Sequence, residues 1–354
     1  MKIRSRKQAL KRFLFSLSLF TIVIFGLLKL VDKAKVKKLR VIQTNGTSLF
    51  LENLFGTEDD IEIDNSIFFL DTTRMKNPHK QRELTLRQIC SIESAAMSNP
   101  HMRIFVIIVS PFVITKAIKF TPQMNAILNY PNVYLKAMHL VQYTIDSPLE
   151  NFIANGSIFK SRFIRAHTAD ALRLLLLWKF GGTYLDTDMI VRKNLSSVSN
   201  FICREHGFLN QAIININIKG KRGRNFAEMF MQDMIENFDG NEWSTNGPFM
   251  LQRVLSKLCK TSDVNEMHNC NGFHVLEDSL CYPVKGTKWE LLFDEKIGNE
   301  IVELTKNSLV VHFWNKLSHM QKLKCESNAA YTQLARKFCP KTMSYCEDFF
   351  WGWK

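Results

Sequence analysis

Apolar and polar residues form blocks along the chain that predict strands and helices in alternation. Apolar residues recur at helical spacing in 83–98, 167–180, 226–238 and 248–258. Short runs rich in β-branched and aromatic residues, which are typical of strands, occupy 66–70, 104–110, 132–135, 183–185, 212–218 and 308–313. The run 104–110 is apolar at every position but the last, as in strands that a parallel sheet buries on both faces. The alternation predicts an α/β domain with a mainly parallel sheet.

One apolar run near the N-terminus is of a different kind. Residues 13–28 carry no charge, and a helix extended to Val31 would be about 28 Å long, against about 30 Å for the apolar part of a bilayer. No small-residue cleavage site follows, so we expect a retained transmembrane signal-anchor rather than a cleaved signal peptide. The expected organisation is a cytoplasmic tail at 1–12, the anchor at 13–31, a stem at 32–60 and a folded domain at 61–345.

The net charge of +14 belongs mainly to the flanks of that run. Residues 1–40 hold twelve of the 47 Lys and Arg and one of the 33 Asp and Glu, so they account for +11. The other 314 residues are close to neutral for their length, which argues against nucleic acid as a partner. Eight cysteines without a C-x-x-C pair favour an oxidising compartment over a zinc site. Glycosylation sequons at Asn45, Asn155 and Asn194 agree with a lumenal domain.

The chemistry is concentrated between residues 170 and 191. Asp170 and Arg173 are three apart on one predicted helix and therefore share a face. Gly181-Gly182 ends that helix, and a short strand then delivers Asp186 and Asp188 at its carboxyl end, where open α/β sheets bind ligands. Two carboxylates in this position suit a hard divalent cation such as Mn²⁺ or Mg²⁺.

A lone D-x-D is a weak signal, because a chain of this length shows about one by chance and a solvated turn explains it. The full pattern D-x-x-R-x7-G-G-x-Y-x-D-x-D is far more specific. Phosphatases also use a strand that ends in D-x-D, but there the motif opens the domain, whereas more than a hundred residues precede it here. A calcium-binding loop is excluded, since its glycine and its final glutamate are missing.

The segment resembles the sugar-binding DxD region of glycosyltransferase family 32, and within it the lactosylceramide 4-alpha-galactosyltransferase (globotriaosylceramide synthase) group. The likeness runs from about Ser66 to Pro340, through SIFFLDTT, CSIESAA, YPNV, LLLLWKFGGTYLDTDMIVRKNL and VVHFWNK. It implies a single-pass type II protein of the Golgi membrane, with a lumenal GT-A-like catalytic domain at 61–345. Such a protein would move a hexose from a UDP-sugar to a galactoside with retention, in glycosphingolipid biosynthesis.

The resemblance also implies roles for four residues. Asp186 and Asp188 would hold the metal and the UDP diphosphate, and Asp170 and Arg173 would bind hydroxyls of the donor sugar. The donor would be UDP-galactose or UDP-N-acetylgalactosamine, and the acceptor a lactosylceramide-like glycolipid that receives an alpha-1,4 linkage. Vertebrate members have Gly where this chain has Gln211, and Gln where it has Asn246, so donor and acceptor stay open.

Three further residues have two possible roles each, and a loop between two helices has one. His312 ends an apolar strand, where its imidazole would complete the metal shell or be a core histidine. Trp314 would stack on a sugar or pack in the core, and Asn210 would contact the donor sugar or stabilise a turn. Trp243, Asn246 and Gly247 lie in a turn-rich stretch between two helices, which we interpret as an acceptor-side loop.

Three expectations complete the interpretation. The relatives have cysteines at the spacing of Cys259 and Cys270, which implies a disulfide between them. The carboxylates placed in the site are all committed to metal or sugar, so we expect attack on the same face as the departing UDP. Asp233 and Glu236 on the predicted helix 226–238 stay open as carboxylate nucleophiles. The alternatives are a membrane-anchored lectin descended from a transferase, and the same chemistry on a glycoprotein.

Overall fold

The computed structural model describes residues 43–44, 48–49, 51–78, 83–114 and 118–350. The chain divides into two units, 1–41 and 42–354, and all described residues belong to the second. The predicted tail and anchor, 1–12 and 13–31, lie outside the described residues. Within the described residues, no helix combines the length and the apolar character needed to cross a membrane.

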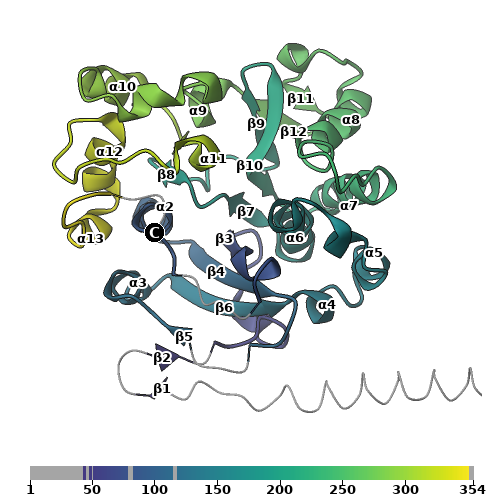
Figure 1. The fold of residues 1–354 in the computed structure, drawn as a ribbon. Helices are drawn as coiled ribbons and strands as arrows, with labels where there is room; N and C mark the ends of the chain where they lie inside the picture. The colour runs from purple at the N-terminus through teal and green to yellow at the C-terminus, as the bar shows by residue number, and fades with distance from the viewer. Residues whose placement is uncertain (1–42, 45–47, 50, 79–82, 115–117, 351–354) are drawn as a thin grey trace, which may run out of the picture. The chain divides into compact units, whose positions relative to one another are not determined.

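An eight-stranded sheet is the centre of this unit, and it is mixed (Figure 1). Four of its seven neighbouring pairs are parallel and three are antiparallel. The predicted α/β class is therefore confirmed, with the parallel part concentrated in the middle and at one edge. In spatial order the strands are β11 (Asn269–Cys270), β12 (Phe273–Leu276), β9 (Phe201–Glu205), β10 (Phe208–Ile216), β7 (Gly182–Leu185), β3 (Ser66–Asp71), β4 (Arg103–Ser110) and β6 (Val133–His139).

Successive residues of β3 face two different cores. Ile67 and Phe69 join one buried cluster, and Phe68 and Leu70 join the other, because side chains alternate along a strand. The longer helices α6 (Ile164–Phe180), α7 (Lys221–Glu236) and α8 (Pro248–Cys259) cover one face, and α2 (Leu86–Ser98), α12 (Ala330–Phe338) and α13 (Pro340–Met343) cover the other (Figure 1). The strands are thus buried on both sides, as the apolar run 104–110 predicts.

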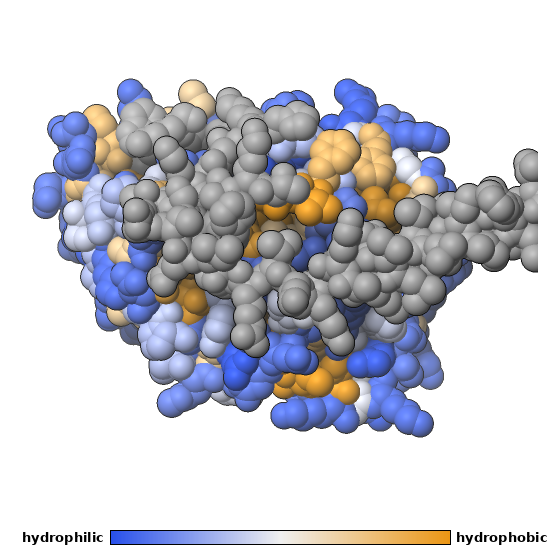
Figure 2. Space-filling model, turned by 90° about the horizontal axis from the view of Figure 1, so that it is seen from below, coloured by the Kyte–Doolittle hydropathy of each residue, from blue (hydrophilic) through white to orange (hydrophobic). Residues whose placement is uncertain are grey.

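Shorter elements complete the unit. The helices are α3 (Pro122–Leu128), α4 (Leu140–Tyr143), α5 (Glu150–Ala154), α9 (Asp278–Cys281), α10 (Gly298–Leu304) and α11 (Asn315–Ser318). One small sheet is made of β1 (Gln43–Thr44), β2 (Ser48–Leu49) and β5 (Ile118–Lys119), and another of β8 (Met189–Val191) and β13 (Val310–His312). On the side seen from below, hydrophobic residues are visible among the hydrophilic ones (Figure 2).

The predicted elements are all present, with shifted ends. Helix α2 begins at Leu86 rather than 83, because Thr85 and Gln88 form a capping box that fixes its start. Helix α7 begins at Lys221, before the apolar pattern of 226–238 becomes visible. Strand β10 begins at Phe208 and has an irregular register against β9 between Asn210 and Ile214, which hides the strand period there.

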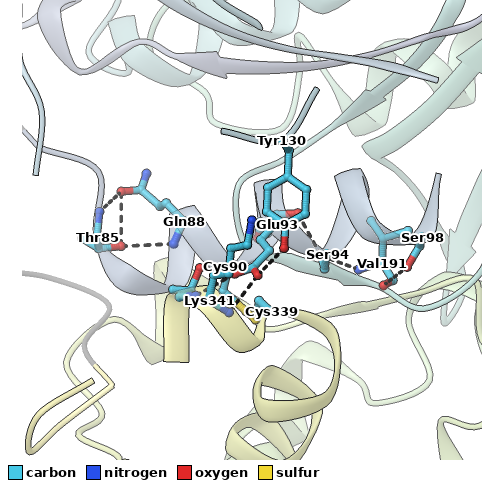
Figure 3. Close-up of a disulfide and its surroundings, with 12 residues drawn as sticks. Thr85, Gln88, Cys90, Glu93, Ser94, Ser98, Tyr130, Val191, Cys339 and Lys341 are labelled. Carbon is cyan, nitrogen blue, oxygen red and sulfur yellow. Dashed lines mark hydrogen bonds between the residues drawn. A yellow bond between two sulfur atoms is a disulfide. The ribbon is translucent and has the colours of Figure 1, made fainter. Parts of the chain in front are cut away.

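The C-terminal helices are locked onto α2 by a buried carboxylate and a disulfide (Figure 3). Glu93 is fully buried and accepts hydrogen bonds from the Tyr130 hydroxyl, the Lys341 and Thr342 N–H groups and the Thr342 hydroxyl. Cys90, one turn earlier on α2, is bonded to Cys339. Burial and the hydrogen bond to Glu93 both raise the pKa of the Tyr130 hydroxyl.

All eight cysteines are paired. The expected bridge between Cys259 and Cys270 is confirmed, and the others are Cys90–Cys339, Cys203–Cys281 and Cys325–Cys346. The expected stem reaches into the described unit, where Leu54 is fully buried and Lys136 forms ion pairs with Glu52 and Asp60. At the other end, Phe350 is buried in the core.

Candidate active site

The turn from α6 into β7 depends on its two glycines. Gly181 has a positive φ of 64°, and a Cβ there would lie 1.8 Å from Oδ1 of Asp64. Gly182 is already the first residue of β7, with φ 87°, and a Cβ on it would lie 2.3 Å from the carbonyl oxygen of Ser66 on β3. Only glycine fits both positions. The pair therefore brings β7 tightly against β3 and fixes where the strand begins.

The two acidic residues of the D-x-D follow the end of β7 and meet a histidine from far along the chain. The Asp186 N–H is held by the Ala212 carbonyl at 2.8 Å. Strand β8 starts at Met189 and pairs with β13, which places His312 opposite Met189. Ligand atoms of Asp186, Asp188 and His312 all lie within 4.8 Å of one another. The structure thus brings together the three residues for which a metal role is expected.

This donor set fits a divalent cation such as Mn²⁺ or Mg²⁺. Carboxylate oxygens suit hard cations, and imidazole is accepted by Mn²⁺ and the later transition metals. His312 Nε2 lies 3.1 Å from Asp188 Oδ1, and its Nδ1 is buried with no hydrogen-bond partner among the described residues. Buried polar atoms without partners are rare, and Oδ1 of Asn315 and Oε1 of Gln211 are two more at this site. Such a group of orphaned atoms indicates a polar ligand.

Burial and charge act in opposite directions on these groups. Burial alone would raise the pKa of Asp188, but the His312 imidazole and the Asn315 N–H outweigh it, so the pKa falls. Burial alone would lower the pKa of His312, and the Asp188 carboxylate more than reverses that effect. Burial raises the pKa of Asp186, with partial compensation from Arg173. The Asp188 carboxylate and the His312 imidazole thus stabilise each other's charged forms, and a bound cation would take over the compensation that the imidazole gives Asp188 here.

Asp170 and Arg173 share one face of α6, as their spacing predicts. Arg173 Nη2 lies 3.0 Å from Asp170 Oδ1 and 3.5 Å from Asp186 Oδ1, so the pair is adjacent to the metal cluster. Its Nη1 donates to the Gln211 carbonyl at 2.7 Å, and its guanidinium lies 4.4 Å from the ring centroid of Tyr184. Burial raises the pKa of Asp170 to about 7, although Arg173 opposes that shift.

The loop before α8 meets this pair through Gly247. A Cβ on Gly247 would lie 2.3 Å from Nε2 of Gln211, which itself donates to Asp170 Oδ1 at 2.8 Å. Asn246 is turned away from Asp170. Its amide donates to the Asp239 carbonyl at 2.7 Å and its oxygen accepts from the Asp239 N–H at 2.9 Å. The Asn246 side chain thus stabilises the conformation of the loop, and Gly247 lies next to Gln211 and Asp170.

The side chains of Asn210 and Trp314 form hydrogen bonds with other residues of the chain. The Asn210 amide donates to Glu205 at 2.6 Å, and its oxygen accepts from the Ala212 N–H at 2.9 Å, which is a turn-stabilising arrangement. Trp314 is buried and donates its indole N–H to the Val284 carbonyl at 3.1 Å. Its ring lies edge to face with His312, at 4.3 Å between centroids. Both residues support the site in the described structure.

Several residues of the site were not among the candidates chosen from the sequence. The Tyr184 hydroxyl donates to Asp186 Oδ1 at 2.6 Å, and Gln88 of α2 donates to the Thr187 hydroxyl at 3.3 Å. Asn315 binds Asp188 through its backbone, and Glu205 is close enough to contribute to the raised pKa of His312. Of these, only Tyr184 lies inside the recognisable motif, so it alone could have been chosen from the sequence.

Comparisons with known proteins agree with this geometry. Residues 85–206 match the family model described as glycosyltransferase sugar-binding region containing DXD motif, and residues 219–346 match alpha 1,4-glycosyltransferase conserved region. The lactosylceramide 4-alpha-galactosyltransferases of Mus musculus and Homo sapiens are each 30% identical to the chain. The matches cover 78% of the chain and 75% and 76% of those proteins. The alpha-1,4-N-acetylglucosaminyltransferase of Homo sapiens is 25% identical, with 78% and 79% covered.

Solved structures of glycosyltransferases are also similar to this chain, at lower sequence identity. PaToxG glycosyltransferase gives a TM-score of 0.41 at 18% identity, with 56% of this chain and 70% of that one covered. The galactosyltransferase LgtC, in complex with donor and acceptor sugar analogs, gives 0.40 at 13% identity, with 79% and 95% covered.

Proposed function

Because the chain belongs to the alpha-1,4-glycosyltransferase family that includes lactosylceramide 4-alpha-galactosyltransferase, we propose that it moves a hexose from a UDP-sugar to a galactoside on a glycolipid. The proposed product is an alpha-1,4 linkage, made by a GT-A-like domain. The observation that carries this proposal is the convergence of Asp186, Asp188 and His312 beside the Asp170–Arg173 pair.

Asp186, Asp188 and His312 are the residues that would hold a divalent ion, with Mn²⁺ or Mg²⁺ as the proposed metal. When bound there, the ion supplies positive charge to the diphosphate as the anomeric bond breaks. The chain itself contributes orientation: Tyr184 fixes Asp186 by its hydroxyl, and the Asn315 N–H fixes Asp188. Neither carboxylate then has to reorganise during the reaction, which is the basis of electrostatic preorganisation.

The sugar side of the site is proposed at Asp170 and Arg173. Asp170 accepts hydrogen bonds and Arg173 donates them, so together they can orient neighbouring hydroxyls. Gln211 occupies the space between Asp170 and Gly247. This amide lies against the carboxylate that we assign to the sugar, so we propose that it influences the donor preference for galactose or N-acetylgalactosamine.

A donor and acceptor panel tests the function. The purified chain is given UDP-galactose, UDP-N-acetylgalactosamine and other UDP-sugars, with lactosylceramide or free lactose, and products are identified by mass analysis. UDP release that requires a galactoside acceptor supports the proposal. Binding of galactosides without turnover of any UDP-sugar would instead identify a lectin. Transfer confined to glycoproteins would show that the acceptor is a glycoprotein and not a glycolipid.

We also propose a single-pass type II topology in the Golgi membrane, with residues 13–31 as the span. Its support is the uncharged run with basic flanks and the membership in the family. Asn155 and Asn194 are exposed in the described structure, so both sequons are open to glycosylation on a lumenal domain. Glycan-shift mapping with Asn155→Gln and Asn194→Gln measures this. A cytosolic C-terminus with a protected N-terminal tag would overturn the orientation.

A further inference from the structure

Arg87, the second residue of α2, is a buried cation without a carboxylate partner. It is 2% exposed, and no ion pair between described residues includes it. Its guanidinium donates instead to three backbone carbonyls, those of Ser318 at 3.1 Å, Phe350 at 3.2 Å and Gln321. Buried charges are usually paired with an opposite charge. Here the three carbonyls are therefore the interactions that compensate the burial.

Two of these carbonyls belong to a turn that follows His312 and touches the metal cluster. We define residues 314–321 as the site turn. Its first residue, Trp314, has a left-handed φ of 53°, and the helix in it, α11, has four residues. Its second residue, Asn315, donates its N–H to Oδ2 of Asp188 at 2.8 Å. So short a helix is not stable alone, and a left-handed backbone outside glycine persists only where its surroundings hold it. The site turn therefore depends on contacts from outside it.

Arg87 supplies such contacts at the far end of the site turn. Ser318 is the last residue of α11, and the last carbonyls of a helix have no partner inside it. The guanidinium satisfies the Ser318 carbonyl and also the Gln321 carbonyl three residues later. Because its donors form one planar, rigid fork, a single side chain fixes two points of the site turn.

Helix α2 gives Arg87 a fixed position. A capping box fixes the start of the helix, and the disulfide from Cys90 binds it to the C-terminal helices (Figure 3). Gln88, the next residue after Arg87, donates to the Thr187 hydroxyl at 3.3 Å, between the two acidic residues of the D-x-D. The first turn of α2 thus contacts both the D-x-D and the site turn, which meet at Asp188.

We infer that Arg87 is a positioning residue of the metal cluster. It acts through the Ser318 and Gln321 carbonyls, which keep the site turn, and with it the Asn315 N–H, where that N–H orients Asp188. The inference rests on the metal role proposed for Asp188. Removing Arg87 should therefore weaken metal binding by more than a loss of stability alone explains.

The first experiment measures Mn²⁺ binding to the purified full chain by electron paramagnetic resonance, without substrate. We expect Arg87→Met to raise the Kd for Mn²⁺ about tenfold, as residues that orient metal ligands from outside the coordination shell do. Arg87→Lys should give an intermediate Kd, because a single ammonium replaces the fork of donors. Arg336→Met is the matched control and should leave the Kd unchanged. Arg336 also donates to two backbone carbonyls, those of Cys325 and Ser327, which lie outside the site turn.

A second control separates positioning from stability. Ile127 of α3 is fully buried, so Ile127→Ala should lower the urea midpoint of unfolding through the cavity that it leaves. We expect its Kd for Mn²⁺ to stay at the value of the unmodified chain. A rise as large as that of Arg87→Met would overturn the inference, because any loss of stability would then weaken the metal site.

The second experiment uses neither metal nor activity. Hydrogen exchange of the backbone amides is followed by mass spectrometry in the unmodified chain, Arg87→Met, Arg87→Lys and Arg336→Met. Faster exchange in 315–321 of both Arg87 variants, with α6 and the Arg336 variant unchanged, supports the inference. Unchanged exchange in 315–321, or an equal rise in α6, overturns it, as does an unchanged Kd for Mn²⁺ in both Arg87 variants.

Two further outcomes are also decisive. If Arg87→Met does not fold, Arg87→Lys, which keeps the positive charge, decides both measurements. If the unmodified chain binds no Mn²⁺, the proposed metal role fails, and the hydrogen exchange of 315–321 alone decides whether Arg87 holds the site turn.

Discussion

The backbone N–H of Asn315 donates a hydrogen bond to Oδ2 of Asp188 across 2.8 Å. The two residues are 127 positions apart, and each lies in a different one of the two matched family regions. Arg87 supports the contact from α2, since its guanidinium donates to the Ser318 carbonyl at 3.1 Å at the end of α11. The second matched region thus completes a site whose metal-cluster carboxylates come from the first.

Replacing Asp188 should abolish most of the activity without unfolding the chain. Asp188→Asn keeps the shape and an acceptor oxygen for Asn315 but removes the negative charge that holds the metal. We expect transfer to fall at least about a hundredfold, the usual cost of losing one preorganised electrostatic group. Asp59→Asn, at an exposed position, is the control.

Metal removal gives an independent check of the same site. EDTA should abolish transfer by the unmodified chain, and added Mn²⁺ should restore the activity. Full activity in EDTA would contradict the metal role, and near-normal activity of Asp188→Asn would exclude this carboxylate from it. Circular dichroism of both variants establishes that the fold is kept.

Gly247→Ala should disturb the acid on which the sugar is proposed to bind. A methyl group there would lie 2.3 Å from Nε2 of Gln211, so the amide must leave its hydrogen bond to Asp170. We expect kcat/KM for the donor to fall by about tenfold, the cost of one buried hydrogen bond to a charged group. Gly220→Ala is the matched control, because its Cβ would meet nothing within 4 Å. Equal behaviour of the two variants would place Gly247 outside the binding site.

Local spacing made part of this site predictable from the sequence. Asp170 and Arg173 are one helical turn apart, so their pairing follows from the helix alone. The end of β7 before Asp186 was likewise visible from the glycine pair and the apolar run. The three antiparallel pairings of the sheet were not predictable, because a strand's sequence does not say in which direction its neighbour runs.

Contacts that depend on long-range register could not be read in the same way. His312 was a candidate metal ligand, but its place next to Asp188 follows from the pairing of β13 with β8. Gln88 and Glu205 reach the site only because α2 and β9 pack where they do. Their residue types are common on any surface, so no pattern distinguishes them before the fold is known.

The disulfides should differ in their contribution to stability. In the chain-entropy model a bridge stabilises by restricting the unfolded chain, more so for longer loops. Cys259 and Cys270 are 11 residues apart, and Cys90 and Cys339 are 249 apart. We therefore expect the double serine variants to lose about 3 and about 5 kcal/mol of unfolding free energy, respectively. Urea denaturation measures both, and a larger loss for Cys259→Ser/Cys270→Ser would contradict the entropic account.

The last prediction concerns the stereochemistry of transfer. A UDP-hexose has an alpha anomeric bond, so an alpha product means net retention. Retention needs either a carboxylate nucleophile with two inversions or departure and attack on the same face. Asp233 and Glu236 of α7 were open candidates from the sequence. In the structure Asp233 pairs with Arg253 at 2.5 Å, and Glu236 accepts from Gln232 at 2.6 Å.

The structure adds Glu205 as a further carboxylate to test as a nucleophile. It accepts from the Asn210 amide at 2.6 Å and contributes to the raised pKa values of His312 and Tyr282. We expect same-face attack, with a diphosphate oxygen taking the acceptor's proton. Glu205→Gln should then stay within about tenfold of the unmodified chain, the size expected of a charge lost near the site, and should still make an alpha product. Removal of a true nucleophile costs on the order of 10⁴ or more. A beta-linked product by NMR would refute retention, and a glycosyl adduct trapped on Glu205 would refute the same-face route.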